Sequence, residues 1–345
     1  MAALAASASA PAMRLRELVM GFRATQLMHV AARLNLADHL RHGARSAREL
    51  AGVVGADAQA LRRVMRALAG LGVLVQHDDE TFALAPLGEP LCSDHDDSVH
   101  ALAVLYGEPW LWQAYGALLQ GVRSGRTAFD AVHGQRFFAF LQQHPHAAAS
   151  FDAAMSGYSR SEAAAIAAAY VDFATMRHVV DVGGGHGALL AALLRRHPRL
   201  HATLFDRAVV TDAAHAAIAT GDLAPRLHCV AGDFFERVEP AGADAYLLKN
   251  VVHDWEDDDA LALLRACRAA CIAASRLLLV ERLLPEPGDA APPDAVLFDI
   301  NMLVTVGGRE RSAREHAALL QAAGLRVTRV VPTAGVLAIV EAVRA

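Results

Sequence analysis

The chain contains 345 residues, of which 54% are hydrophobic and 20% charged, and its 32 basic and 37 acidic side chains give a formal net charge of −5. This length predicts two domains, or one large domain with an appendage, and the composition is that of folded cores and not of a disordered chain. The acidic balance provides no broad basic surface for nucleic acid or anionic lipid, so we expect a small-molecule partner.

The first residues and the cysteines carry no targeting or metal-binding signal. Residues 1–13 lack the basic start and long apolar core of a signal peptide and are predicted to form a disordered tail. No window approaches the roughly 20 uninterrupted apolar residues of a membrane helix. The four cysteines are too few and too irregularly spaced for a disulfide framework, and no CxxC pair suggests zinc, which fits a reducing cytoplasm. They are Cys92, Cys229, Cys267 and Cys271.

Residues 14–100 have the pattern of a winged helix. Apolar residues recur with the helical period from about residue 14 to 75. Ser46 and Glu49 have the spacing of a capping box, and Asp57 is placed to cap the next helix. The stretch "LGVLVQHDDETFALAPLG" then alternates apolar and polar residues around an acidic turn, which predicts a small hairpin.

Two functions are open to such a domain. Arginines on one predicted helix would suit DNA, but the many acidic residues nearby weaken attraction to phosphate. The first helix carries Leu15, Leu18, Val19, Phe22, Leu27 and Val30. This is more apolar surface than a monomer usually exposes, and we therefore interpret residues 14–100 as a dimerisation domain of a homodimer.

Residues 101–170 are predicted to be a helical connector. The segment is rich in alanine and has helical spacing of large apolar residues. Such residues most often pack in a core, but some could line a pocket for a flat, apolar ligand. They include Trp110, Trp112, Phe137, Phe138, Phe151 and Met155.

After residue 170 the period changes to that of an α/β domain. Short runs rich in valine and leucine, such as "HVVDVGGG" and "RLLLVERLL", alternate with helix-like segments, which predicts a doubly wound parallel sheet over residues 171–345. The last two runs, "LRVTRVVPT" and "GVLAIVEAV", are joined by a tight turn and should pair antiparallel at one edge. That finish is unusual for a dinucleotide-binding domain.

Ligands of such sheets bind beyond the carboxyl ends of the strands. The predicted strand ends are Asp181–Gly187, Asp206, Asp233 with Phe234, Lys249 leading to His253, and Glu281. The glycine loop can be read as GxGxxA with Asp206 as a ribose-binding acid, so a nicotinamide dinucleotide is one candidate. Asp181 directly before the loop would repel a pyrophosphate but suits an ammonium group. S-adenosylmethionine, which carries an amino-acid tail and no phosphate, is therefore the preferred cofactor.

The sequence resembles the S-adenosylmethionine-dependent small-molecule O-methyltransferases, such as plant caffeate methyltransferases and bacterial enzymes for aromatic polyketides and phenazines. The resemblance covers nearly the whole chain and rests on "FDAAMSGYS", "DVGGGHG", "GDFF", "LKNVVHDWEDDDA", "VERLLP" and "GGRERS" in the family's order. It implies an N-terminal all-helical winged-helix dimerisation domain and a Rossmann-like class I methyltransferase domain. Where many plant members have a polar residue before the late "GG", this chain has "TVGGRE", so their substrates do not carry over.

The resemblance also implies the catalytic residues. His253 matches the family's general base, and Glu281 and Glu310 match the two acids that flank it. A phenol with a pKa of about 10 is mostly protonated at neutral pH, and a neutral imidazole can remove its proton. A carboxylate such as Glu281 could orient the ring. Asp257, Asp258 and Asp259 are interpreted only as favourable charges in the first turn of the next helix.

The cofactor contacts that we predict are Ser159, Asp181, Gly183, Gly184, Gly185, Asp206, Asp233, Phe234 and Lys249. The predicted acceptor contacts are Trp110, Met155, Asp254, Phe298 and Met302, and the resemblance implies that Met155 and Met302 bracket an aromatic ring. No metal is expected. Two rival functions stay open, namely another reaction on the same fold, such as N-methylation or hydroxylation, and a winged-helix DNA-binding regulator.

Overall fold

A computed structural model describes residues 10–218, 221–290 and 293–345. The chain forms two compact units: unit 1 holds residues up to Trp112 together with His146–Gly157, and unit 2 holds Gln113–Pro145 and Tyr158–Ala345. Most of the predicted N-terminal tail lies outside the described residues. Residues 10–13 belong to the first helix, α1, and the tail boundary predicted at residue 13 is therefore wrong. Alanine, methionine, leucine and arginine, which dominate this helix, are all strong helix formers.

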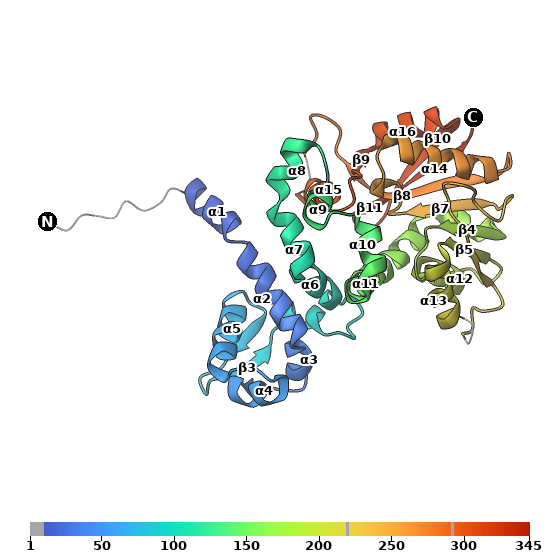
Figure 1. Ribbon diagram of the computed structural model, residues 1–345. Coiled ribbons are helices and arrows are strands. Elements are labelled where there is room, and N and C mark those ends of the chain that lie inside the picture. The colour runs from blue at the N-terminus through green and yellow to red at the C-terminus, as the bar shows by residue number, and fades with distance from the viewer. Residues whose placement is uncertain (1–9, 219–220, 291–292) are drawn as a thin grey trace. The chain divides into compact units, whose positions relative to one another are not determined.

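Unit 1 consists mainly of short helices, of which α1 to α5 are drawn in blue in Figure 1. Its elements begin with α1 (Ala10–Val19), α2 (Phe22–Arg33), α3 (Leu36–Leu40), β1 (Arg45–Ser46), α4 (Ala47–Val54) and α5 (Ala58–Gly70). They continue with β2 (Leu74–Gln76), β3 (Thr81–Leu84), the 3-10 helix η1 (Pro86–Leu91) and α6 (His100–Gly107). The predicted hairpin is present as β2 and β3, and β1 adds a third antiparallel strand. The unit is therefore helical with a small sheet, and not purely helical.

The predicted helix starts in unit 1 are confirmed. The Ser46 hydroxyl accepts from the Glu49 amide, and the Glu49 carboxylate accepts from the Ser46 amide at 2.7 Å. Asp57 caps α5 by accepting from the Ala60 amide at 2.8 Å. Each cap satisfies amides that have no partner within the helix.

The segment 101–170 is divided between the two units, so the prediction of a single connector is wrong. In unit 1, α6 packs against α2: Nδ1 of His29 contacts the Val104 carbonyl oxygen at 2.9 Å, and a Cβ on Gly107 would lie 2.1 Å from the His29 ring. This close packing joins the start of the segment to the N-terminal helices. The other helices are α7 (Pro109–Gly116), α8 (Leu118–Ser124), α9 (Ala128–His133), α10 (Phe137–Gln143) and α11 (Pro145–Ala169).

Unit 2 contains the predicted α/β sheet. Its strands are β4 (His178–Val182), β5 (His201–Asp206), β6 (Leu227–Ala231), β7 (Ala245–Lys249), β8 (Arg276–Leu284), β9 (Arg311–Ser312), β10 (Leu325–Pro332) and β11 (Leu337–Arg344). Its helices after α11 are η2 (Val171–Thr175), α12 (Ala188–Arg196), α13 (Ala208–Ile218), η3 (Val252–Asp254), α14 (Asp257–Ala270), α15 (Pro293–Val304) and α16 (Ala313–Ala322).

The strand order is β10-β11-β8-β7-β4-β5-β6, with β9 beside the end of β8. Strands β4 to β8 are parallel, and β11 pairs antiparallel with both β8 and β10, which confirms the predicted edge hairpin. Successive strand residues point into two cores. Val179 and Leu278 pack with α12, whereas Val180 and Leu277 pack with α14 and α16. Helices thus cover both faces (Figure 1), as expected for a parallel sheet.

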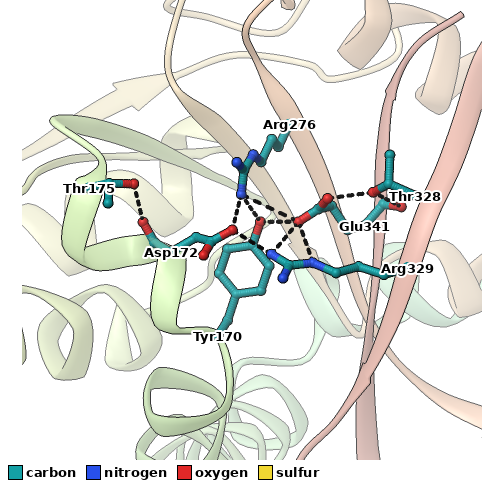
Figure 2. Close-up of polar contacts among 7 residues, drawn as sticks. All are labelled: Tyr170, Asp172, Thr175, Arg276, Thr328, Arg329 and Glu341. Atoms are coloured by element: carbon teal, nitrogen blue, oxygen red, sulfur yellow. Dashed lines mark hydrogen bonds and ion pairs between the residues drawn. The ribbon is translucent and has the colours of Figure 1, made fainter.

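A polar network joins the edge hairpin to η2, at the amino end of β8 (Figure 2). The Tyr170 hydroxyl donates to Glu341 at 2.5 Å, and Arg329 donates to the same carboxylate at 2.8 Å. Arg276 and Arg329 both bond Asp172. All of these charges are paired, so the network anchors the hairpin. It lies at the amino end of β8, away from the carboxyl ends of the parallel strands, where the sequence predicts the ligand site.

In the three described ranges, no helix combines the length and apolar character that crossing a membrane requires.

Candidate active site

The strand order reverses between β4 and β7, and the chain after β4 forms the glycine loop. Gly183, Gly185 and Gly187 have φ angles of 74°, 59° and 76°, which glycine adopts without strain. A Cβ on Gly184 would lie 2.6 Å from the Asp181 carboxylate. The loop therefore needs glycine both for its turns and for its contact with Asp181.

Asp181 is buried at the end of β4, with 2% of its surface exposed, and its Oδ1 atom has no hydrogen-bond partner. Burial raises the pKa of this carboxyl to about 7, an effect that the charge of Lys249 opposes and the charge of Asp206 increases. An unpaired buried carboxylate oxygen is costly. An ammonium group would supply the missing partner, so the position fits the amino-acid end of S-adenosylmethionine.

Asp206 lies at the end of β5 beside the same loop. Its Oδ2 accepts from the Gly185 amide at 3.0 Å and its Oδ1 from the Arg207 amide at 2.7 Å. Burial raises its pKa, while these two hydrogen bonds oppose the shift. The carboxylate is thus fixed next to the glycine loop, with further lone pairs that two hydroxyl groups of a ribose could use.

Asp233 and Phe234 follow β6, which ends two residues before Asp233. The Asp233 carboxylate accepts from the Phe235 amide at 2.8 Å. The Phe234 ring contacts the rings of Phe235 and Trp255 edge-on, and one of its edge atoms lies 3.8 Å from where a Cβ of Gly183 would be. The structure therefore brings this pair, Asp181 and Asp206 to the glycine loop.

Lys249 ends β7 and reaches α11. Its ammonium lies 2.8 Å from Glu162 and 3.3 Å from the Ser159 hydroxyl, and only 8% of the side chain is exposed. Ser159 and Lys249 are therefore neighbours, as two predicted cofactor contacts should be. Glu162 was missed by the sequence reasoning. Its signal was an acid at the start of the alanine-rich end of α11, three residues after Ser159.

His253 lies in η3, directly after β7, and is 5% exposed. Its Nδ1 lies 2.8 Å from Glu310 Oε1 and 3.5 Å from Glu281 Oε2. The other oxygen of Glu281 accepts from the amides of Val251 and Val252, at 3.2 Å and 2.9 Å. Glu310, and not Glu281, is therefore the acid that orients the ring. Glu281 lies inside β8, which continues to Leu284.

The charged groups of this cluster shift the pKa values of one another. Burial alone would lower the pKa of His253, but the charge of Glu281, the hydrogen bond to Glu310 and the charge of Asp254 outweigh burial and raise it to about 9. Burial raises the pKa of Glu281, against the opposing effect of His253. Burial also raises the pKa of Asp254 to about 6. The imidazole is the centre of a buried group of acids that favours its protonated form.

The ligand atoms of His253, Glu281 and Glu310 all lie within 4.8 Å of one another, a spacing that could also suit a metal ion. The short contact between Nδ1 and Glu310 has the length of an ordinary hydrogen bond. A proton between the two atoms accounts for that contact.

The structure brings together only some of the residues that are predicted to contact the methyl acceptor. The Phe298 ring lies 6.0 Å from the His253 ring, measured between ring centroids. The Arg282 guanidinium lies over the face of the Phe298 ring, 4.0 Å from its centroid. Met302, one helical turn further along α15, is buried. Asp254 Oδ1 lies 3.5 Å from His253 Nε2. These residues belong to unit 2, whereas Trp110 and Met155 belong to unit 1, and their contact with an acceptor stays a prediction.

The glycine loop and the histidine turn are in contact. A Cβ on Gly183 would lie 2.9 Å from the Val251 side chain, two residues before His253. The predicted cofactor site at the carboxyl ends of β4, β5 and β6 is therefore next to His253, the candidate base. This arrangement suits a reaction in which a bound cofactor transfers a group to an acceptor while a neighbouring base removes a proton from that acceptor.

Comparison with known proteins bears on both units. The O-methyltransferase domain family matches residues 115–326, and the O-methyltransferase dimerisation domain family matches residues 16–94. The phenazine O-methyltransferase PhzM of Lysobacter antibioticus is 38% identical over 328 residues, covering 95% of each chain. The mitomycin biosynthesis 6-O-methyltransferase of Streptomyces lavendulae is 41% identical over 333 residues, covering 95% of this chain and 93% of that protein.

Solved structures of O-methyltransferases are also similar to this chain. The LaPhzM crystal structure matches with a TM-score of 0.91 at 38% identity, covering 96% of this chain and 99% of that chain. The O-methyltransferase NcsB1 from neocarzinostatin biosynthesis, solved with S-adenosylmethionine and a naphthoic acid, matches with a TM-score of 0.80 at 34% identity, covering 93% and 96%. The chain therefore belongs to the S-adenosylmethionine-dependent O-methyltransferases, with a dimerisation domain followed by the catalytic domain.

Proposed function

We propose that this enzyme methylates a hydroxyl group of an aromatic secondary metabolite and that His253 is its general base. The observation that carries this proposal is the contact between His253 Nδ1 and Glu310 at 2.8 Å. With its Nδ1 proton donated to Glu310, the neutral ring has its lone pair on Nε2. Nε2 is then the atom that accepts the proton of the acceptor hydroxyl.

The proposed reaction divides the work between cofactor and protein. When bound, S-adenosylmethionine would supply a methyl group on a positively charged sulfur and would leave as neutral S-adenosylhomocysteine once the bond between sulfur and methyl breaks. His253 removes the hydroxyl proton as the oxygen attacks, which is typically worth about 10²–10⁴-fold in rate. The acids Glu310 and Glu281 stabilise the imidazolium that results. Holding the oxygen in line with the methyl group supplies the rest of the acceleration.

The cofactor contacts follow from the chemistry of each position. Asp181 would pair with the ammonium group, Asp206 would accept from the ribose hydroxyls, and Asp233 with Phe234 would hold the adenine. Ser159 and Lys249, which contact one another, complete the proposed set with the glycines of the loop. All of these positions except Ser159, which lies on α11, rest on strand-end geometry.

The acceptor is proposed to be a planar phenol, such as a phenazine or an aromatic polyketide. Relatives named for phenazine and mitomycin substrates support this class. Phe298, whose ring lies 6.0 Å from the His253 ring, and Met302, one turn further along α15, support an apolar ring-binding surface. We propose that Asp254, Trp110 and Met155 complete the acceptor contacts.

His253→Ala tests the proposal. We expect turnover of a phenolic acceptor to be abolished while the Kd for S-adenosylmethionine, measured by calorimetry, stays near wild type. A panel of phenazines, aromatic polyketides and phenylpropanoids with labelled methyl donor identifies the acceptor, and mass spectrometry of the product separates methylation from hydroxylation. Substantial activity of the variant at neutral pH would remove His253 from the role of base.

A further inference from the structure

A buried arginine lies behind the turn that carries His253. Arg311 follows Glu310 directly, is 1% exposed, and is among the largest fully buried side chains of the described residues. The mechanism proposed above gives it no task. Since a guanidinium is always charged and carries five donors, burial is tolerated only where acceptors surround it.

Those acceptors belong to the histidine turn. Arg311 Nη1 donates to the Val252 carbonyl at 3.1 Å, and Nη2 donates to the Trp255 carbonyl at 2.8 Å. Nε and Nη2 also donate to Asp257, the first residue of α14, at 3.1 Å and 2.8 Å. The guanidinium therefore binds the backbone on both sides of His253 and ties it to the start of the next helix.

The segment that carries Arg311 contacts the turn around His253 at a third point, Gly308. A Cβ on Gly308 would lie 2.0 Å from the His253 carbonyl oxygen and 2.4 Å from the Asp254 carbonyl carbon. The backbone at Gly308 is thus packed directly against the backbone of His253. Gly308 supports the turn, Glu310 bonds the imidazole, and Arg311 bonds the carbonyls on either side.

We propose that Arg311 is a positioning residue, whose planar guanidinium fixes the backbone of residues 252–257 so that His253 is aimed at the acceptor hydroxyl. This inference rests on the proposed function of His253 as the base. A lysine could reach one of these acceptors as a point charge, but it cannot bridge the two carbonyls with a fixed fork. Displacing a catalytic group by about 1 Å costs about 10²-fold in rate, so loss of the fork should appear in kcat.

The test compares Arg311→Lys and Arg311→Met with Arg309→Met. Arg309 is half exposed and bonds the same Asp257, but its side chain does not bond the carbonyls of the turn. We expect Arg311→Lys to lower kcat by about 10²-fold, with the acceptor KM and the Kd for S-adenosylmethionine unchanged. Arg309→Met should match wild type. If Arg311→Met does not fold, Arg311→Lys carries the test.

A second acceptor separates positioning from general damage. A nitrophenol that is already ionised at the assay pH does not need the base. The defect of Arg311→Lys should therefore shrink with this acceptor, whereas a damaged fold would lower turnover of both acceptors equally. Equal losses on both, or wild-type kcat on the neutral phenol, would overturn the inference.

The double variant with His253→Ala keeps this test distinct from that of the proposed function. If His253 is the base, Arg311→Lys should not further lower turnover of the ionised nitrophenol once His253 is removed. An active His253→Ala enzyme would mean that the proposed base is wrong. An inactive His253→Ala enzyme combined with a fully active Arg311→Lys enzyme would mean that only the role of Arg311 is wrong.

Discussion

Glu310 Oε1 lies 2.8 Å from Nδ1 of His253, although the two residues are 57 positions apart in the chain. Each is placed by its own element, His253 by the end of β7 and Glu310 by the approach to β9. The Glu310 amide donates to Asp299 at 2.9 Å, which ties its backbone to α15. The orientation of the ring thus depends on three segments that meet only in the folded protein.

The first prediction concerns pH. The carboxylates around His253 raise its pKa to about 9, and only the neutral imidazole can accept a proton. The kcat/KM for a phenolic acceptor should therefore rise with pH toward about 9 and then level off. A profile that stays flat from pH 6 to 9 would contradict this assignment.

Glu310→Gln should change that profile in two ways. Removing the negative charge lowers the pKa of His253, so the midpoint of the profile should move to lower pH. The maximal rate should fall by roughly 10-fold or more, because the charge no longer stabilises the imidazolium. Glu256→Gln, which changes an exposed acid three residues after His253, is the matched control and should leave both unchanged. An unshifted midpoint in Glu310→Gln would show that Glu310 does not set the pKa of the base.

Cofactor affinity should depend on Asp206. We expect Asp206→Ala to weaken binding of S-adenosylmethionine by roughly 1.5–3 kcal/mol, the range of a charge-assisted hydrogen bond. The variant also releases the Gly185 amide, which the carboxylate now holds. Calorimetry measures the Kd, and Asp212→Ala, an exposed acid on α13, serves as the control. Unchanged affinity in Asp206→Ala would refute the ribose site.

Chelation tests the absence of a metal requirement. Dialysis against EDTA should leave turnover unchanged, because a proton occupies the contact between His253 and Glu310. Loss of activity that added zinc restores would instead make His253, Glu281 and Glu310 a metal centre.

Assembly should depend on the first helices. The dimerisation domain family spans residues 16–94, and Leu18 and Phe22 are 60% and 53% exposed in the single chain. Replacing both with glutamate should place unpaired carboxylates in an apolar interface and split the homodimer. Light scattering gives the oligomeric state, with Arg63→Glu on α5 as a charge control. A double variant that remains dimeric would place the interface elsewhere.

Most of the fold could be predicted because its signals are local. The alternation of short apolar runs with helices predicts the parallel sheet of unit 2, and the spacing of Ser46 and Glu49 predicts a helix start. The strand ends predict which polar residues gather at one edge, since parallel strands end on the same side. Asp181, Asp206 and Phe234 all lie at the glycine loop for this reason.

What the sequence missed depends on contacts between distant segments. Nothing in the period of residues 101–170 shows that α6 packs on α2, because helical spacing does not identify the partner of a helix. The choice of Glu310 over Glu281 as the acid that bonds His253 depends on the difference between contacts of 2.8 Å and 3.5 Å. The ion pair between Glu162 and Lys249 joins α11 to β7, and the bonds of Arg311 join β9 to the histidine turn.

The order β10-β11-β8 has a consequence for synthesis of the protein. Strand β11, which is synthesised after β10, occupies an interior place in the sheet, whereas β10 forms the edge. Until β11 inserts, the apolar strand β8 keeps an open hydrogen-bonding edge, which is a hazard for aggregation. The nascent chain can therefore complete its catalytic sheet only after translation has passed β11, and chaperone binding in that interval would protect β8.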